Sequence, residues 1–454
     1  MIPPLLAVHH LSINFNSEGN SLTAVKDISF NVFAGEVVAV VGESGSGKSV
    51  TALSLMQLLP KQARVSGQLL FSIENKETAS LNNISEKEIN AIRGKNIAMI
   101  FQEPMTSLNP VFTCGYQVME TIRLHQKISA AKAKEKTIAL FEKVKLPDPA
   151  AMISRYPHQL SGGQKQRVMI AMAISCNPSL LIADEPTTAL DVTVQKTILE
   201  LIKELQLQSG MAVLLITHDL GLVADIADKV LVMYKGEIVE QGKTVTVLQN
   251  PQHPYTKALL QCRPAMHQRG ERLPVVSDFL EEQKVALASH KDGKFHDQEV
   301  SNLPDKSALS TKNAEGQTPG ASASIVLKIE NLDVHFHGKK TLFGKSSAPF
   351  KAVNNVNFSV SQGETVGLVG ESGCGKTTLG RAILQLIPVT SGTITLNGVN
   401  LAGLSKKAMQ PLRKDLQIVF QDPYGSLNPR LTIGAAIREP MKIHGILESN
   451  NARK

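Results

Sequence analysis

The sequence has few aromatic residues and few cysteines, and each scarcity excludes a class of protein. Phe, Trp and Tyr make up 4% of the 454 residues, and tryptophan is absent. The four cysteines are far apart in the sequence and form no C-x-x-C pair. A disulfide framework or a zinc ribbon is therefore not expected, and the cysteine pattern fits a reducing cytosol.

Long apolar runs and a targeting leader are also missing. No apolar run approaches the roughly 18 residues that a membrane-spanning helix needs. The start, MIPPLLAVHH, lacks the basic residues and the long apolar core of a signal peptide. We expect a chain that does not span a membrane by itself, so that action at a membrane would require a spanning partner.

The composition fits a globular protein of two or three domains. Apolar residues make up 42% of the chain and charged residues 19%. The net charge of +8 could indicate nucleic acid or an anionic membrane surface as a partner. Because no dense Lys/Arg run is present, we interpret it as a solvated surface.

The sequence does contain an internal repeat. Residues 24–60 and 352–388 align without a gap, and each segment carries a glycine-rich loop, GESGSGKSV in the first and GESGCGKTT in the second. The segments MIFQEPMTSLNP (99–110) and IVFQDPYGSLNP (418–429) follow in the same order. We therefore predict a tandem domain duplication.

Between the repeats the chain is polar. Residues 261–323 lose the apolar periodicity and are rich in Ser, Lys, Asp, Glu and Gln, which is typical of a flexible linker. The predicted organisation is a first domain at 1–260, a linker at 261–323 and a partial second domain at 324–454.

Each glycine-rich loop stands between a predicted strand and a predicted helix. EVVAVVG and ETVGLVG are short apolar runs, and SVTALSLMQLL and TTLGRAILQLI show helical spacing of apolar residues. LLIADE and MAVLLITHD are further apolar strands, typical of a parallel sheet buried on both faces. Residues 118–156 read as a helical subdomain. We predict an α/β P-loop NTPase fold with a helical subdomain, duplicated, with the second copy truncated.

The pattern G-x-x-x-x-G-K-[ST] occurs at Gly42, Gly47, Lys48 and Ser49. Such glycines let backbone N–H groups converge on phosphate at a helix N-terminus. The lysine can reach the β- and γ-phosphates, and the serine hydroxyl can hold Mg²⁺. A chance glycine-rich turn is the alternative. Val50 replaces a hydroxyl residue, so one side-chain contact to phosphate is missing.

Two acidic residues, Asp184 and Glu185, end the apolar strand LLIADE. Acidic side chains are seldom buried without a partner. Phosphoryl transfer needs a metal ion, positive charge and an oriented nucleophile. We therefore predict that Asp184 lies near Mg²⁺ and that Glu185 polarises the attacking water.

The stretch LSGGQKQR, residues 160–167, presents a hydroxyl and open backbone amides ahead of a predicted helix, which makes a second anion-binding surface. With the motifs above, it resembles the ATP-binding-cassette (ABC) ATPases, whose signature is LSGGQ. By this resemblance Gln102 corresponds to the Q-loop glutamine, TALD (188–191) to the D-loop and His218 to the switch histidine. Phe15 and Phe336 match the aromatic residue that stacks on adenine, although strand packing is an alternative explanation for both.

The resemblance implies ATP and Mg²⁺ as ligands and assigns the site residues. The implied catalytic residues are Lys48, Glu185 and His218. The implied ATP-binding residues are Phe15, Gly42, Glu43, Ser44, Gly45, Ser46, Gly47, Lys48, Ser49, Val50, Gln102, Ser161, Gly162, Gly163, Gln164, Phe336, Gly370, Glu371, Ser372, Gly373, Cys374, Gly375, Lys376, Thr377, Thr378 and Gln421. The implied metal ligands are Ser49, Gln102, Asp184, Thr377 and Gln421.

The segment PQHPYTKALL, residues 251–260, narrows the resemblance to the oligopeptide, dipeptide, nickel and glutathione importer ATPases. Tandem members, as in glutathione or microcin C import, are the most similar. Some relatives carry a cysteine cluster for an iron–sulfur centre after this segment, but only Cys262 is present here, so none is expected.

The resemblance also implies partners and a location. The partners would be two membrane permease subunits, an extracytoplasmic solute-binding protein and another nucleotide-binding domain paired head to tail, with no nucleic acid. The location would be peripheral, on the cytoplasmic face of the bacterial inner membrane. The alternative is a soluble tandem ABC ATPase acting on ribosomes or nucleic acid, whose long basic linker is not seen.

The second half has a P-loop and a Q-loop but no signature, no Asp-Glu pair and no switch histidine. Three interpretations stay open: a fragment or frameshifted product, a separate chain that supplies the rest, or two copies that pair through their first halves. We expect the second P-loop to bind nucleotide without efficient hydrolysis.

Overall fold

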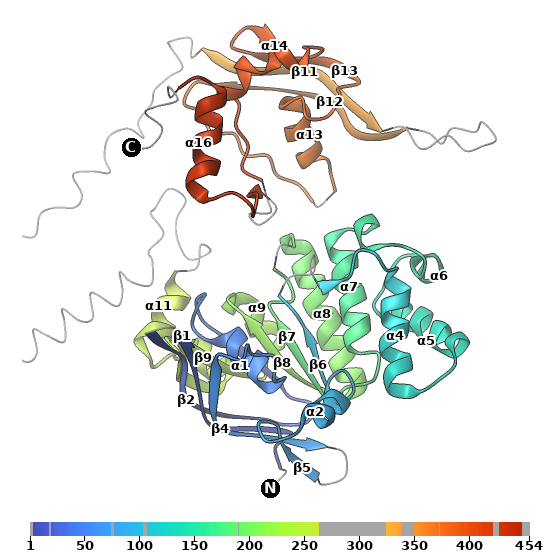
Figure 1. Cartoon of the computed structure of the whole chain (residues 1–454), viewed down its shortest axis with the longest axis vertical. Helices are drawn as coiled ribbons and strands as arrows, with labels where there is room; N and C mark the ends of the chain where they lie inside the picture. The colour runs from blue at the N-terminus through green and yellow to red at the C-terminus, as the bar shows by residue number, and fades with distance from the viewer. Residues whose placement is uncertain are drawn as a thin grey trace, which may run out of the picture. The chain divides into compact units, whose positions relative to one another are not determined.

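The computed structural model forms two compact units, each considered by itself (Figure 1). The predicted domain boundaries stay predictions, because almost all of the expected linker lies outside the described residues, as do Ser372 and Gln421. The structure describes residues 3–17, 20–73, 77–102, 107–188, 190–262, 324–336, 349–371, 373–420 and 426–446.

A six-stranded sheet in the order β10-β9-β3-β8-β7-β6 forms the centre of the first unit. Every neighbouring pair is parallel except β10 with β9. The predicted strands LLIADE and MAVLLITHD are β7 and β8, and they pair in parallel as expected. The strands are β3 (Val37–Val41), β6 (Ile97–Ile100), β7 (Leu180–Asp184), β8 (Ala212–Thr217), β9 (Lys229–Tyr234) and β10 (Glu237–Lys243).

Strand β3 shows why this sheet is buried on both faces. Side chains alternate across a strand, and here Val37, Ala39 and Val41 join one core cluster while Val38 and Val40 join another. Burying a valine side chain contributes roughly 1.5–3 kcal/mol. The predicted α/β fold is confirmed, and β3 delivers the glycine-rich loop to the carboxyl edge of a rigid sheet.

A four-stranded antiparallel sheet in the order β2-β1-β4-β5 covers one face of the central sheet. Helix α1 (Lys48–Leu55) packs in the same cluster through Ala52 and Leu55, and α2 (Glu86–Ile92) adds Ile89 and Ile92. The strands are β1 (Leu6–Ser17), β2 (Asn20–Val32), β4 (Ala63–Ile73) and β5 (Glu77–Ser80).

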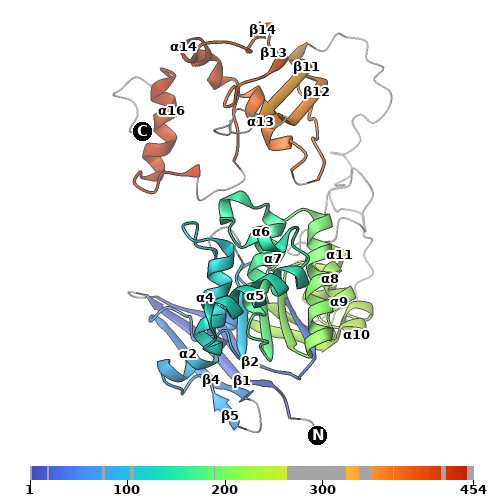
Figure 2. The same ribbon diagram turned by 90° about the vertical axis from the view of Figure 1, so that its right-hand side faces the viewer.

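Helices cover the other face, and the predicted helical subdomain is confirmed among them (Figure 2). Each of its helices begins at a residue whose side chain accepts a backbone N–H, namely Thr113, Ser129 and Asp148. The elements of the rest of the unit are α4 (Cys114–Gln126), α5 (Ala130–Lys143), α6 (Pro149–Met152), η1 (Pro157–Gln159), α7 (Gly162–Ala173), α8 (Val192–Ser209), α9 (Leu220–Ile226), α10 (Thr244–Gln249) and α11 (Pro254–Gln261).

The second unit repeats the antiparallel layer, with strand order β12-β11-β13-β14 and α13 packed on it. The predicted helix after the second glycine-rich loop is α13. The elements are β11 (Ile325–Phe336), β12 (Phe350–Ser361), α13 (Lys376–Ile383), β13 (Ser391–Leu396), β14 (Val399–Asn400), α14 (Lys406–Met409), η4 (Pro411–Lys414) and α16 (Ile433–Ile443).

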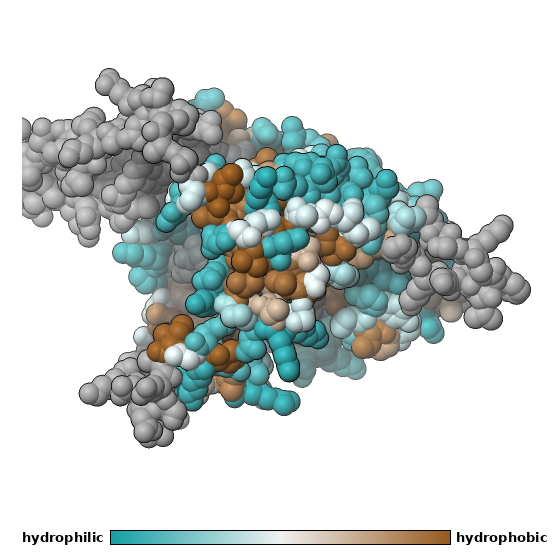
Figure 3. Space-filling model, turned by 90° about the horizontal axis from the view of Figure 1, so that it is seen from above, coloured by the Kyte–Doolittle hydropathy of each residue, from teal (hydrophilic) through white to brown (hydrophobic). Residues whose placement is uncertain are grey.

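One predicted strand is wrong. The run ETVGLVG forms no strand, and its apolar side chains are exposed, with Val369 at 88%. Its counterpart β3 pairs with β8 and β9, and the described part of the second unit has no strand corresponding to either. Without a neighbour to complete the ladder, an extended segment leaves its backbone groups unpaired. Figure 3 shows one face of the molecule, on which apolar side chains lie at the surface among polar ones.

Candidate functional site

The first glycine-rich loop, residues 42–47, joins the end of β3 to the first residue of α1. Three of its glycines have positive φ, at 151° for Gly42, 81° for Gly45 and 103° for Gly47. A Cβ on Gly42 would lie 2.2 Å from the Met233 carbonyl oxygen, and one on Gly47 would lie 2.6 Å from that of Ala24. The loop therefore requires glycine at both positions for steric reasons.

Lys48 folds back over this loop. Its Nζ donates to the carbonyl oxygens of Gly42 and Glu43, both at 2.8 Å, and lies 3.4 Å from Ser46 Oγ. The side chain is buried, and desolvation lowers the pKa of Lys48, although Glu185, Asp184 and Glu43 oppose this effect. The ammonium is thus held over the loop by its carbonyl oxygens.

Ser49 joins the loop to the end of β7. Its hydroxyl donates to Asp184 Oδ1 at 3.0 Å. Asp184 is 4% exposed, and burial raises its pKa to about 6, which the bond from Ser49 and the charge of Lys48 only partly oppose. The structure therefore brings together a serine hydroxyl and a carboxylate that are both predicted metal ligands.

Three polar side chains from three parts of the chain contact the Glu185 carboxylate. Its Oε2 accepts from Thr188 Oγ1 at 2.8 Å and from Gln102 Nε2 at 3.2 Å, and His218 Nδ1 lies 3.4 Å from the same oxygen. The predicted glutamine and histidine therefore meet at the predicted glutamate. The contact of Thr188 was missed, although its place three residues after Glu185 in TALD was a signal that it lies close by.

The backbone at Glu185 holds this side chain in an uncommon conformation. Its φ of 45° lies in the left-handed region, which few non-glycine residues adopt. The Glu185 N–H donates to the Ile216 carbonyl oxygen of β8 at 2.9 Å. Strained backbone of this kind gathers at functional sites.

The LSGGQ segment begins α7. Ser161 Oγ accepts from the Gln164 N–H, while Gln164 Oε1 accepts from the Ser161 N–H, which forms a capping box. A Cβ on residue 163 would lie 2.9 Å from the Val194 side chain, which explains why a glycine, Gly163, occupies this position. Helices α7 and α1 belong to different core clusters, so Ser161–Gln164 and the first P-loop are carried on opposite faces of the sheet.

The predicted adenine-stacking residues lie at or near the ends of corresponding strands. Phe15 lies on β1, half-buried against the core cluster of the antiparallel sheet, and Phe336 lies on β11 with 46% exposure. Val50 is half-buried on α1 against the same cluster as Phe15. Stacking on a base stays a prediction for both aromatic residues.

The second P-loop has nearly the same backbone shape. Gly370, Gly373 and Gly375 have φ of 154°, 86° and 101°. Lys376 Nζ donates to the carbonyl oxygens of Gly370 and Glu371 at 2.6 and 2.7 Å. Thr377 is exposed, and within the described part of the second unit no carboxylate bonds to it as Asp184 bonds to Ser49.

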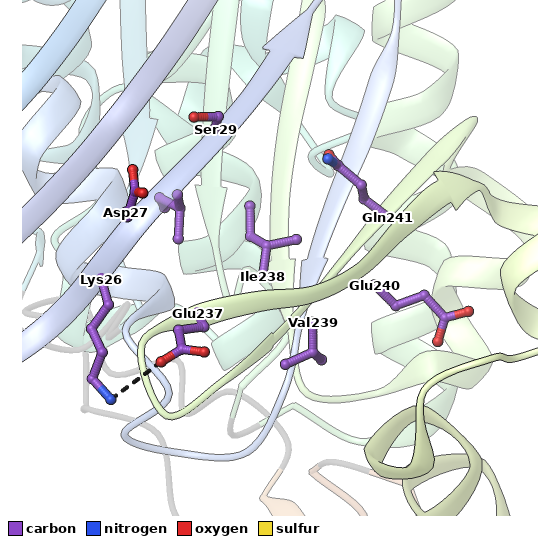
Figure 4. Close-up of a pocket in the computed structure, with 9 residues that line it drawn as sticks. Lys26, Asp27, Ser29, Glu237, Ile238, Val239, Glu240 and Gln241 are labelled. Atoms are coloured by element: carbon purple, nitrogen blue, oxygen red, sulfur yellow. Dashed lines mark hydrogen bonds and ion pairs between the residues drawn. The ribbon is translucent and has the colours of Figure 1, made fainter.

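A groove of about 620 Å³ lies beside β2 and β10, but it is poorly suited to a nucleotide (Figure 4). Its lining carries Asp27, Glu237 and Glu240 against one ammonium, that of Lys26, which lies 3.4 Å from Glu237. Three carboxylates would repel phosphate. The glycine-rich loop stays the predicted phosphate site.

Comparison with known protein families shows which family this chain belongs to. The family described as "ABC transporter" matches residues 25–188 and 353–453. The chain belongs to the ABC transporter family. The family described as "Oligopeptide/dipeptide transporter, C-terminal region" matches residues 239–286, which include the HPYT segment of this ABC protein.

Curated relatives extend over nearly all of this ABC protein. The glutathione import ATP-binding protein GsiA of Salmonella choleraesuis (strain SC-B67) is 46% identical over 453 residues, which is 99% of this chain and 69% of that protein. GsiA of Escherichia coli (strain K12) is 45% identical over 455 residues, with the same shares.

Solved ABC structures are also similar to this chain. A dimeric bacterial ABC transporter cassette, MJ0796, matches 53% of this chain and 98% of its own, with 27% identity and a TM-score of 0.47. Cassette cbiO1 of Clostridium perfringens matches 54% of this chain and 91% of its own, with 28% identity and a TM-score of 0.45. Within the described residues of this ABC protein, no helix is long and apolar enough to cross a membrane.

Proposed function

We propose that this chain binds ATP at its first P-loop and hydrolyses it to drive an ABC importer of peptides or related small solutes. Glu185 polarises the attacking water, Lys48 holds the β- and γ-phosphates, and His218 is the switch histidine. The observation that carries the proposal is the convergence of Thr188, Gln102 and His218 on one oxygen of Glu185.

Because these contacts all involve Oε2, the other carboxylate oxygen of Glu185, Oε1, is left for water. In the described part of the chain, the bonds and the close contact to the Glu185 carboxylate all involve Oε2. Oε1 is therefore the oxygen that would accept a hydrogen bond from water. A group that orients the nucleophile is the main requirement that phosphoryl transfer places on side chains.

The residues around Ser49 fit Mg²⁺. The ion prefers oxygen ligands and usually takes one or two carboxylates together with phosphate oxygens and water. Ser49, Asp184 and Gln102 offer a hydroxyl, a carboxylate and an amide oxygen, and Thr377 and Gln421 would serve the second P-loop. When bound, Mg²⁺ neutralises the charge that develops on the phosphate oxygens. No group of three His, Cys, Asp or Glu suited to a metal ion occurs among the described residues.

Lys48 would exchange its hydrogen-bond acceptors when nucleotide binds. In this structure its ammonium is satisfied by two carbonyl oxygens of the loop. The incoming β- and γ-phosphates offer anionic oxygens to the same group, and charge-assisted bonds are stronger than those to neutral carbonyls. The backbone N–H groups of residues 44–49 supply the rest of the cradle.

A second cassette would complete the site. Because Ser161–Gln164 and the first P-loop are carried on opposite faces of the sheet, the signature of another cassette would close over the first P-loop in a head-to-tail pair. The second P-loop has no counterpart of Glu185 among the described residues of its unit. The tandem duplication, the domain boundaries and the second nucleotide site are parts of this proposal.

The partners and the solute are inferred from the relatives. GsiA is named for glutathione import, and the segment at residues 239–286 matches a region of oligopeptide and dipeptide transporters. We infer two permease subunits and an extracytoplasmic binding protein as partners, with the chain peripheral on the cytoplasmic face of the bacterial inner membrane. The solute belongs to the peptide class, with glutathione as the first candidate.

Glu185→Gln tests the proposal. The amide keeps the size of the side chain but cannot accept a proton from water, so the rate of ATP hydrolysis should fall by roughly 10²–10⁴-fold, the usual contribution of a general base. ATP binding, measured by calorimetry, should stay near the wild-type value because the P-loop is unchanged.

Glu200→Gln on the exposed face of α8 is the matched control and should hydrolyse ATP at the wild-type rate. Unchanged turnover in Glu185→Gln would refute the catalytic role. A wild-type chain that does not bind ATP would refute the proposed function as a whole.

A further inference from the structure

Tyr255 belongs to α11, the last described helix of the first unit, and contacts the first P-loop. It is the second residue of α11 and is fully buried. Its hydroxyl oxygen accepts the backbone N–H of Glu43, the second residue of the loop, at 2.9 Å. The two residues are 212 positions apart in the sequence, so this bond exists only through the fold.

The peptide group that joins Gly42 to Glu43 is therefore held at both of its polar groups. The Glu43 N–H donates to Tyr255, and the Gly42 carbonyl oxygen accepts from Lys48 Nζ at 2.8 Å. When Lys48 turns to phosphate, the carbonyl loses that donor, while the bond to Tyr255 involves no group that phosphate would take. The tyrosine is thus the anchor of this peptide that does not depend on the state of the lysine.

Tyr255 is well placed to be a permanent acceptor. Burial raises its pKa to about 12, so the hydroxyl stays neutral across the physiological range. Its ring packs on that of Tyr234, with centroids 4.2 Å apart. Tyr234 ends β9, and the following turn also contacts the loop, because the Gly236 N–H donates to the Ser46 carbonyl oxygen at 3.1 Å.

The segment that carries Tyr255 is fastened to the sheet independently of the P-loop. Glu240 of β10 accepts the N–H groups of Gln252 at 2.8 Å and His253 at 3.0 Å. Burial alone would raise the pKa of Glu240, but the Thr256 hydroxyl and these two amides lower it overall. Figure 4 shows the Glu240 carboxylate directed away from the pair of Lys26 and Glu237.

We propose that Tyr255 is a positioning residue for nucleotide: it fixes the peptide group that joins Gly42 to Glu43 in the P-loop and so makes ATP affinity depend on the segment at residues 251–260. The inference rests on the proposed ATP site. It gives a function to the HPYT segment within this chain, since the segment sets the shape of the phosphate cradle while contacting no phosphate itself.

Tyr255→Phe in the full chain tests this inference. The variant keeps the ring on Tyr234 and removes only the acceptor of the Glu43 N–H. Leaving the part-buried Glu43 N–H without its acceptor should weaken ATP binding by roughly fivefold. The titration is done with Lys376→Ala in every sample, so that it reports on the first P-loop alone.

Two comparisons distinguish positioning from a general loss of structure. KM for ATP should rise while kcat at saturating ATP is unchanged, because bound phosphates restore the loop. Inorganic triphosphate should lose the same factor as ATP, because the loop holds phosphate and not the base. Tyr234→Phe removes a hydroxyl from the neighbouring ring and should leave the affinity unchanged.

The outcomes separate this inference from the function on which it rests. If the parent chain binds ATP and Tyr255→Phe binds it equally well, or if kcat falls with KM unchanged, the positioning role is overturned. If the parent chain itself does not bind ATP, the proposed function is the one that fails.

Discussion

At the scale of single residues, the site is defined by how Asp184 and Glu185 differ. Asp184 ends β7, is buried and bonds to Ser49, whereas Glu185 leaves the strand at a φ of 45° and turns to Thr188, Gln102 and His218. Because the backbone changes direction between Asp184 and Glu185, the two adjacent carboxyl groups have different surroundings. This separation fits one acid for a metal ion and the other for water.

Asp184→Asn should stabilise the chain without nucleotide at neutral and higher pH. Because the folded pKa is raised from 3.8 to about 6, the native state holds the proton more tightly than the unfolded state. Stability therefore falls as pH rises between these values and stays lower above them. Each pKa unit corresponds to roughly 1.4 kcal/mol, so the asparagine variant should gain a few kcal/mol at about pH 8 and little at about pH 4.

Denaturant unfolding at the two pH values measures this effect. Asp225→Asn on the exposed side of α9 is the control and should show no such gain. A gain for Asp184→Asn that is equal at both pH values would contradict the assigned cause.

At the scale of elements, the turn from β3 to α1 is fixed by contacts that only glycine permits. Gly47 lies against the Ala24 carbonyl oxygen of β2, and Gly42 lies against that of Met233 of β9. The loop is therefore clamped between two strands, while Gly45 at its tip has nothing within 4 Å of the site of a Cβ. Rigid sides and an open tip suit a cradle that must meet phosphate.

Gly47→Ala and Gly45→Ala make a matched pair, because both place a methyl group at positive φ. The left-handed conformation costs an alanine roughly 1–2 kcal/mol at either position. Only Gly47→Ala adds a clash, at 2.6 Å, so it should lower the melting temperature and the ATP affinity more than Gly45→Ala. Thermal melting and ATP titration measure both effects, and equal losses would show that the clamp is not rigid.

At the scale of the whole molecule, the two P-loops share a backbone shape but differ in their support. Residues 37–41 form a fully buried strand, whereas residues 365–369 form none and expose Val366, Leu368 and Val369. Lys48 is buried and lies near three carboxylates, those of Glu185, Asp184 and Glu43. Lys376 bonds only to its own loop in the described part of the chain.

A piece of residues 324–454 expressed by itself should therefore fail to melt cooperatively. Its uncovered apolar segments resemble exposed strand edges, which promote association. Calorimetry and light scattering would show a broad transition with aggregation, whereas residues 1–262 should melt in one cooperative step. A sharp, reversible transition for the 324–454 piece would contradict this.

Local patterns in the sequence were sufficient for much of the first unit. The short apolar runs, the helical spacing after each P-loop and the order of the motifs predicted the α/β fold, β7, β8 and the helical subdomain. These features depend on neighbours in the chain, so short stretches encode them. The residues around Glu185 were also named, because Gln102 and His218 stand in recognisable motifs.

Contacts between distant segments needed the folded chain. The choice of Oε2 as the shared acceptor, the bond from Glu43 to Tyr255 and the exposure of residues 365–369 depend on which strands lie side by side. A strand forms only when a neighbour completes its ladder, and a buried hydroxyl has a role only through the group that it meets. Residue type and spacing determine which chemical groups this chain offers. The packing of the sheet determines which of these groups contact one another.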